Sequence, residues 1–184
     1  MTDRFDVRLA GTGGQGMILA GIILAEAAAI GAGKNVAQTQ SYGPEARGGA
    51  SKAEVVVAEG EIDYPKVLQA DLLLAMSQEA CDKYGREVKP KGWLVVDKGR
   101  VKRSPPHPRT IRAPITQMAE EQTGRKITAN IVGLGIIVGL TGIVPREAIA
   151  QAVERRAPPG TKEINQQALE AGLTMADRIR GQYD

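Results

Sequence analysis

The sequence predicts an α/β protein with three layers, α/β/α, around a mostly parallel but mixed sheet, and with a helical C-terminal part. Short apolar runs of strand length alternate with helix-like segments over roughly the first hundred residues, which is typical of layered α/β domains. From residue 115 onward the apolar residues follow helical spacing instead. A chain of 184 residues with 42% hydrophobic residues suits one core, so we expect a single domain over residues 1–184.

The N-terminal segment combines a strand, a glycine-rich turn and a helix. Residues 6–10 are predicted as a short strand and residues 17–30 as a helix of good helix formers, closed by Gly31 and Gly33. Between the two lies the run Gly11, Thr12, Gly13, Gly14, Gln15 and Gly16.

The middle of the chain predicts the remaining strands. We expect strands at 34–40, 53–58, 71–76 and 93–96, and a short helix at 77–84. Glu59 and Gly60 predict a hairpin turn that pairs residues 53–58 with 61–62, too close for a parallel crossover, so the sheet should be mixed. Residues 98–114 are rich in proline and are expected to be irregular.

The C-terminal part predicts four helices, at 115–121, at 129–140, from Pro145 to 156, and one whose apolar face is spaced as Ile164, Ala168, Gly172, Met175 and Ile179. The apolar run 131–144 is shorter than the roughly 20 residues that cross a bilayer. We therefore expect buried helices, no membrane contact and a cytoplasmic protein. Aromatic residues are only 3% of the chain, which argues against nucleic-acid binding by stacking.

The glycine run fits G-x-G-x-x-G between a strand and a helix, a context that favours phosphate groups at the helix N-terminus. A dinucleotide site would also need a carboxylate at the end of the second strand to bind the ribose. Residues 38–41 contain none. A self-standing Rossmann-like nucleotide-binding oxidoreductase remains the alternative, and so does a turn required only for packing.

Strand ends of an open α/β sheet converge on one crevice, which predicts that residues 11–16, 39–42, 77–78 and 97–98 meet. This set offers backbone donors, hydroxyls and amides but no pair of base and nucleophile. Cys81 and His107 are single residues of their type, expected to be packed and solvated, respectively. The sequence therefore predicts a binding site with no catalytic residue and no metal ligands, next to a basic loop at 98–103.

Two motifs in order, the glycine run with its Ala-rich helix and the segment Ser41-Tyr42-Gly43-Pro44-Glu45-Ala46-Arg47-Gly48-Gly49, resemble the gamma subunits of 2-oxoacid:ferredoxin oxidoreductases. The similarity continues through Ala70-Asp71 and through residues 113–116 and 129–135, and thus covers nearly the whole chain. The second motif looks most like the 2-oxoglutarate branch. The branches for pyruvate, branched-chain 2-oxoacids and indolepyruvate remain alternatives.

The resemblance implies an accessory gamma subunit, inactive in isolation, of an enzyme that oxidatively decarboxylates a 2-oxoacid with coenzyme A and passes electrons to ferredoxin. Thiamine diphosphate, magnesium and the iron–sulfur clusters would belong to the alpha and beta subunits, with or without a ferredoxin-like delta subunit. Equivalent domains in fused relatives are implicated in covering the active site and holding coenzyme A. The sequence leaves open whether the isolated chain forms a homodimer.

From this resemblance we expect coenzyme A to contact the two loops. Arg47 is the strongest candidate, since its planar guanidinium can pair with a phosphate or with a partner's carboxylate; an internal ion pair is the structural alternative. The full set of expected binding residues is Gly11, Thr12, Gly13, Gly14, Gln15, Gly16, Ser41, Tyr42, Arg47, Gly48 and Gly49.

Overall fold

A computed structural model describes residues 4–42 and 49–183 and shows a six-stranded sheet in the order β2-β3-β1-β4-β5-β6. The strands are β1 (Arg4–Gly11), β2 (Asn35–Ser41), β3 (Ser51–Ala58), β4 (Ala70–Ala75), β5 (Val88–Asp97) and β6 (Thr110–Ala113). β1, β4, β5 and β6 run parallel, whereas β3 is antiparallel to both β1 and β2. The expected mixed, mostly parallel sheet is confirmed.

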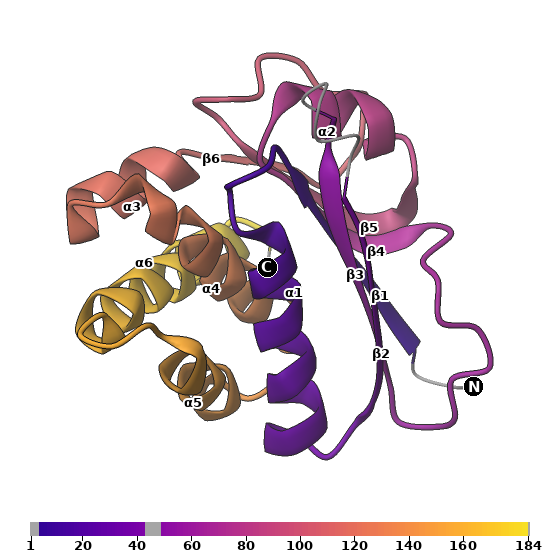
Figure 1. Cartoon of the computed structure of the whole chain (residues 1–184). Helices are drawn as coiled ribbons and strands as arrows, with labels where there is room; N and C mark the ends of the chain where they lie inside the picture. The colour runs from indigo at the N-terminus through magenta and orange to yellow at the C-terminus, as the bar shows by residue number, and fades with distance from the viewer. Residues whose placement is uncertain (1–3, 43–48, 184) are drawn as a thin grey trace.

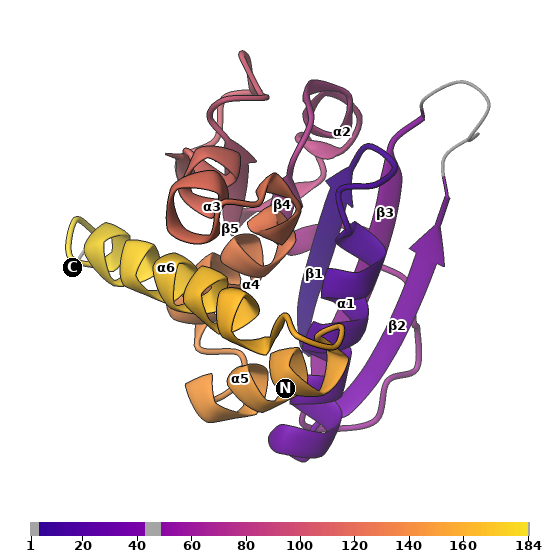
Figure 2. The same ribbon diagram turned by 60° about the vertical axis from the view of Figure 1, so that its left-hand side comes forward.

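The helices form layers on both faces of this sheet (Figures 1 and 2). One face is covered by α1 (Met17–Glu26), which continues as the π-helical turn η1 (Ala27–Gly31), and by α3 (Ile115–Thr123), the short turn η3 (Lys126–Thr128), α4 (Ala129–Thr141), α5 (Arg146–Arg156) and α6 (Lys162–Arg180). The other face carries α2 (Gln78–Tyr84). The three-layer α/β/α class is therefore confirmed, with one layer much thicker than the other.

Two local predictions were wrong. Residues 59–69 form no strand, so the predicted hairpin at Glu59 and Gly60 does not exist. The sheet is mixed because β3 lies between β2 and β1 and runs antiparallel to both. The strand propensity of β3 does not specify with which strands it pairs. β6 was missed within the proline-rich stretch, since only four residues pair there and their edge position needs no strong strand signal.

Helix α4 is the buried centre of the helical layer. Its residues 129–140 are all buried, and it packs closely on α6 through facing glycines. A Cβ atom built on Gly135 would lie 2.4 Å from the Leu169 carbonyl oxygen, and one on Gly172 would lie 2.1 Å from that of Val132. Because glycine has no side chain, the backbones of α4 and α6 can touch at these positions. This close packing buries the longest apolar run of the sequence within the core. No helix among the described residues is long and apolar enough to span a membrane.

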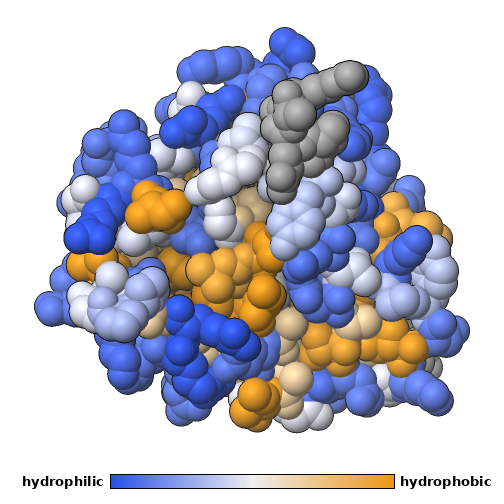
Figure 3. All heavy atoms as spheres, viewed as in Figure 1, coloured by the Kyte–Doolittle hydropathy of each residue, from blue (hydrophilic) through white to orange (hydrophobic). Residues whose placement is uncertain are grey.

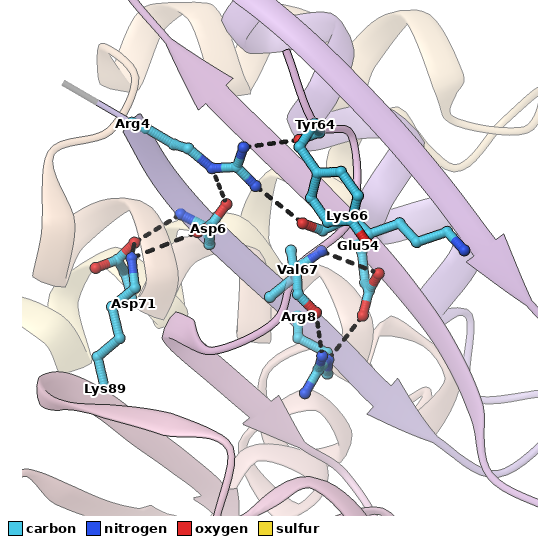
Figure 4. A network of polar contacts seen from close by, with 9 residues as sticks. All are labelled: Arg4, Asp6, Arg8, Glu54, Tyr64, Lys66, Val67, Asp71 and Lys89. Carbon is cyan, nitrogen blue, oxygen red and sulfur yellow. Dashed lines mark hydrogen bonds and ion pairs between the residues drawn. The ribbon is translucent and has the colours of Figure 1, made fainter. Parts of the chain in front are cut away.

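The face that carries α2 is completed by a network of charged side chains (Figure 4). Arg8 on β1 lies opposite Glu54 on β3, and its Nε donates to Glu54 Oε1 at 2.9 Å. Its guanidinium also donates to the Val67 carbonyl oxygen at 2.6 Å, pairs with Glu87, and lies 5.0 Å from the centre of the Tyr84 ring. Burial opposes ionisation of Glu54, but hydrogen bonds from Lys52 and Arg8 outweigh it and lower the pKa of this carboxyl.

A second set of contacts holds the irregular segment of residues 59–69 and the start of β1. Arg4 donates to the carbonyl oxygens of Tyr64 at 2.7 Å and Lys66 at 2.9 Å. Lys89 bridges Asp6 and Asp71, at 3.4 Å and 2.7 Å. The segment 59–69 therefore stays against the sheet by hydrogen bonds from charged groups to its backbone rather than by strand pairing.

Replacing Arg8 by Met should lower the free energy of unfolding by about 3 kcal/mol, because the buried Glu54 would keep only the partly exposed Lys52 as a cationic partner. Replacing Glu54 by Met as well should recover part of this loss, since two apolar side chains leave no unpaired charge. Denaturant unfolding of the variants measures both effects. Arg103→Ala, which removes an exposed ion pair with Asp82, is the control and should change stability by at most about 0.5 kcal/mol; an equal effect at Arg8 would contradict the prediction.

Glu26, at the end of α1, forms ion pairs with both Arg155 and Arg156 of α5. The Nε atom of each arginine lies 2.6 Å from a carboxylate oxygen of Glu26. The hydrogen bond from Arg155, reinforced by Arg156 and opposed by burial, lowers the pKa of Glu26. A depressed pKa in the folded state stabilises the protein above the unfolded-state value near pH 4, and this contribution is lost on further acidification.

Glu26→Gln should therefore be less stable than the parent chain at pH 7 by about 0.5–1 kcal/mol, because both arginines are partly exposed and the pairs are screened. The difference should shrink as the pH falls below about 4. Thermal unfolding at several pH values checks this, and a difference that stays constant with pH would rule out the ion pairs as its cause.

Candidate functional site

The glycine loop joins β1 to α1 at the carboxyl edge of the sheet. Gly14 and Gly16 have φ values of +83° and +74°, a backbone region that glycine adopts without strain. A Cβ on Gly16 would also lie 2.5 Å from Asn130 Nδ2 of α4. Cβ atoms on Gly13 and Gly14 would meet nothing within 4 Å, so the backbone of these two residues faces open space.

Gln15 shapes this loop from within. Its Oε1 accepts the Thr12 N–H at 2.8 Å, and its Nε2 donates to the Met76 carbonyl oxygen at 3.0 Å, just beyond the end of β4. Both the oxygen and the nitrogen of the Gln15 side-chain amide are thus hydrogen-bonded within the protein. The N–H groups of Gly13, Gly14 and Gly16 donate to no described residue, and they remain open to an anion at the start of α1.

A crevice of about 480 Å³ lies beside the loop, where the carboxyl ends of β1, β4 and β5 converge. The sequence predicts that residues 11–16, 39–42, 77–78 and 97–98 meet in one crevice, but of these only residues of 11–16 and 77–78 line it. Asp97 is fully buried instead: it accepts from the Thr116 hydroxyl and the Gly99 N–H. The crevice is lined by Thr12, Gln15, Ser77, Gln78, Gly99, Arg100, Thr116, Gln117, Glu120 and Lys126.

A smaller hollow of about 180 Å³ adjoins this crevice and shares several of its lining residues. It is lined by Gly14, Gln15, Met76, Arg100, Thr116, Lys126, Ile127 and Ala129. The glycine loop therefore has a lined depression directly beside its bare backbone.

Most neutral polar side chains of the crevice are engaged in the fold. Ser77 caps α2 by accepting the Ala80 N–H at 3.1 Å, and Gln78 Oε1 accepts two N–H groups of the basic loop. Two cations differ. Arg100 forms no side-chain hydrogen bond with the described residues, and Lys126 has only Glu120, at 3.6 Å. The groups left for a ligand are thus backbone donors and positive charge.

Thr116 and Lys126 were missed by the sequence analysis. Both belong to the helical half of the chain, α3 and η3, which returns to the sheet edge only in the tertiary fold. A threonine at a helix start and a lysine in a short turn are too common to signal a site by themselves. Arg100 was noticed only as part of the basic loop 98–103.

Ser41, which ends β2 and begins the second motif, lies at the same edge of the sheet as the glycine loop but outside the crevice. β3 separates β2 from β1, with Ser51 opposite Gly11 and Lys52 opposite Ser41. Ser41 and Tyr42 are exposed, Tyr42 accepts a hydrogen bond from Gln40 at 3.1 Å, and Gly49 is half-buried. None of these three lines the crevice. Arg47 and Gly48 lie outside the described residues, so their roles stay predictions.

The described residues contain no group of three or more His, Cys, Asp or Glu side chains that could hold a metal. Cys81 is fully buried, and burial, with help from Asp82, raises the pKa of its thiol, so a reactive thiolate is disfavoured. His107 is held between the Lys89 carbonyl oxygen and the Arg109 N–H. These residues belong to a protein of the α/β class with a glycine loop between a strand and a helix at the carboxyl edge of its sheet.

The particular family follows from comparison with known proteins. Residues 6–175 match the model of the pyruvate ferredoxin/flavodoxin oxidoreductase family, and the chain belongs to that family. It is 48% identical to the 2-oxoglutarate synthase subunit KorC of Methanothermobacter marburgensis over 92% of this chain and 95% of that one. The resemblance to gamma subunits inferred from the two motifs is confirmed.

Solved structures agree with this assignment. The gamma subunit of a keto/oxoacid ferredoxin oxidoreductase from Geobacter sulfurreducens has a TM-score of 0.87 and 47% identity, covering 95% of this chain and 97% of that one. The 2-oxoglutarate:ferredoxin oxidoreductase of Magnetococcus marinus, solved with 2-oxoglutarate, coenzyme A and succinyl-CoA, has a TM-score of 0.83 at 22% identity and shows the shared fold. There the matched region covers only 31% of a longer chain. A self-standing nucleotide-binding oxidoreductase is not favoured.

Gly16→Ala should lower the free energy of unfolding by about 2 kcal/mol, because alanine is strained at φ +74° and its Cβ would press on Asn130. Gly13→Ala, with open space around the new methyl group, is the matched control and should stay within about 0.5 kcal/mol. Thermal or denaturant unfolding measures both. Equal losses of stability in the two variants would show that neither the positive φ of Gly16 nor the contact with Asn130 causes the loss.

Proposed function

We propose that this chain is the gamma subunit of a 2-oxoglutarate:ferredoxin oxidoreductase and that it helps to bind coenzyme A and to cover the active site. The observation that carries this proposal is the open glycine backbone beside a crevice that holds Arg100, whose side chain has no hydrogen-bond partner among the described residues, and Lys126, whose only ion pair there is with Glu120. The relatives named as 2-oxoglutarate synthase subunits support the substrate class.

The groups left free around the glycine loop suit the phosphates of coenzyme A. The bare N–H groups of Gly13 and Gly14 lie at the start of α1, where the helix dipole adds positive potential. Arg100 and Lys126 place two cations on the crevice that these groups adjoin. Coenzyme A supplies the thiol that accepts the acyl group, and this chain would hold its anionic part.

The cofactors that carry out the reaction would be bound by companion chains. We infer that the alpha and beta subunits, with or without a ferredoxin-like delta subunit, bear thiamine diphosphate, magnesium and iron–sulfur clusters. Among the described residues, no group of three or more His, Cys, Asp or Glu side chains could hold a metal ion. The chain would thus act in the cytoplasm as one part of an assembly, as a single domain over residues 1–184.

The loop that contains Tyr42, Arg47, Gly48 and Gly49 is proposed to contact the same ligand from the neighbouring part of the sheet edge. Ser41 and Gly11 stand on strands separated only by β3. A ligand as long as coenzyme A can reach beyond the crevice, and Arg47 would then pair with a phosphate. Pairing of Arg47 with a carboxylate of a partner subunit is the alternative role.

Arg100→Ala and Lys126→Ala should each raise the KM for coenzyme A by about 10-fold in the assembled enzyme, since each removes a charge-assisted contact. The kcat at saturating coenzyme A should change little, and the KM for 2-oxoglutarate should not change. Arg47→Ala tests the second loop in the same assay. Arg86→Ala, an exposed arginine outside the crevice, is the control.

Steady-state kinetics of the reconstituted complex decides the outcome. If Arg100→Ala and Lys126→Ala leave the KM for coenzyme A unchanged, the crevice does not hold this ligand. If leaving the chain out of the assembly does not reduce coenzyme-A-dependent turnover, the subunit role itself is wrong.

A further inference from the structure

A second cavity, of about 170 Å³, lies in the helical layer between α1, η3, the start of α4, the end of α5 and the start of α6. The expected coenzyme A site does not include it. Its walls are mostly aliphatic, and Figure 3 shows apolar surface between α1 and the helices α4 to α6, bordered by hydrophilic side chains. The aliphatic lining comes from Leu19, Ile23, Ile127, Ile131, Val153 and Ile164.

The polar groups in this cavity are already bonded to the fold. Asn130 donates to the Gly16 carbonyl oxygen and accepts the Ile131 N–H, at 3.3 Å and 2.9 Å. Asn165 donates to the carbonyl and hydroxyl oxygens of Thr161, at 2.9 Å and 3.1 Å. An occupant would therefore gain little from hydrogen bonds to these walls and would gain from burying apolar surface.

The size of the cavity limits the occupant. A cavity of roughly 150 Å³ with apolar walls accepts a molecule of about the size of benzene. The present cavity thus accommodates one large apolar side chain and is too small for a nucleotide or for coenzyme A. Its mouth is apolar as well, because Ile127 and Leu19 are 58% and 38% exposed.

The rim of the cavity is positively charged. Arg125 is exposed and forms no ion pair with the described residues, and Lys126 stands next to it. Arg156 is half-exposed on the opposite wall, and its acidic partner Glu26 is shared with Arg155. The rim therefore favours carboxylates beside the apolar occupant.

We propose that this cavity receives a single large apolar side chain, flanked by Asp or Glu, from a partner subunit of the same enzyme. This inference rests on the proposed function. In the Magnetococcus marinus enzyme the matched region is part of a longer chain, whereas it makes up 97% of the separate Geobacter sulfurreducens gamma subunit. A separate chain depends on non-covalent contacts, in which a few anchors inserted into pockets provide most of the affinity.

The position of the cavity supports this occupant. Ile127 lines both the cavity and the hollow beside the glycine loop, and Lys126 precedes it in the turn η3. A partner segment anchored in the cavity would therefore run next to the coenzyme A crevice. Docking there would place the crevice against the partner chain that carries the reacting groups.

The test compares Ile127→Asp with the conservative Ile127→Leu. The probe is the purified assembly of the remaining subunits, titrated with this chain by calorimetry in the absence of coenzyme A. Ile127→Asp should weaken binding by about 30-fold or more, and Ile127→Leu by less than about 3-fold. Because Ile127 is largely exposed, the thermal unfolding of both variants should match that of the parent chain.

The charge of the rim is tested separately with Arg125→Glu, which should weaken binding by about 10-fold and make it less sensitive to salt. Ile30→Asp and Arg86→Glu are the matched controls: Ile30 is 70% exposed, both lie outside the cavity lining, and both should bind like the parent chain.

Each outcome separates this inference from the proposed function. If the parent chain binds the other subunits and Ile127→Asp binds equally well, the docking pocket is overturned while the subunit role stands. If Ile127→Asp disrupts only self-association of this chain, the occupant is a second copy and the proposal is likewise overturned. A parent chain that binds none of the other subunits would overturn the docking pocket and the proposed function together.

Discussion

The buried guanidinium of Arg8 holds together the part of the fold on which the candidate site depends. It lies on the central strand β1, bonds Glu54 on β3 and the backbone of the segment that precedes β4, and contacts the ring of Tyr84 in α2. A short helix alone leaves much of this sheet face uncovered, and the charged network completes it. β1 is thereby fixed between an antiparallel and a parallel neighbour, and its carboxyl end presents the glycine loop.

This arrangement determines which groups are available to a ligand. Near the glycine loop, Gln15, Ser77 and Gln78 use their side chains to bond the ends of the strands and helices to one another. The bare loop backbone and the Arg100 side chain remain open, and the only ion pair of Lys126 within the described part of the chain is with Glu120. Backbone donors and cations at such a site would suit an anionic ligand, which agrees with a role as one subunit of an oxidoreductase.

The helical layer adds a second kind of surface. Close packing of α4 on α6 requires glycines, whereas the end of α5 and the start of α6 help to line an apolar cavity beside Ile127. One short turn, η3, therefore borders both the charged crevice and the apolar cavity. Ligand binding and subunit docking would share this turn, so the two processes can be coupled through a single structural element.

The sequence by itself determined the α/β class, the strand–loop–helix around Gly11–Gly16, the helical C-terminal part and the family resemblance, because these depend on local propensity and on motifs contiguous in the chain. Only the tertiary structure decided that β3 returns between β2 and β1, since residues 53–58 have the same strand propensity in a hairpin with 61–62 as in the observed pairing. Only the fold brought Thr116 and Lys126 to the glycine loop, because their separation of about a hundred residues leaves no local pattern. The cavity beside Ile127 likewise arises from how five separate helical segments pack, which no single segment encodes.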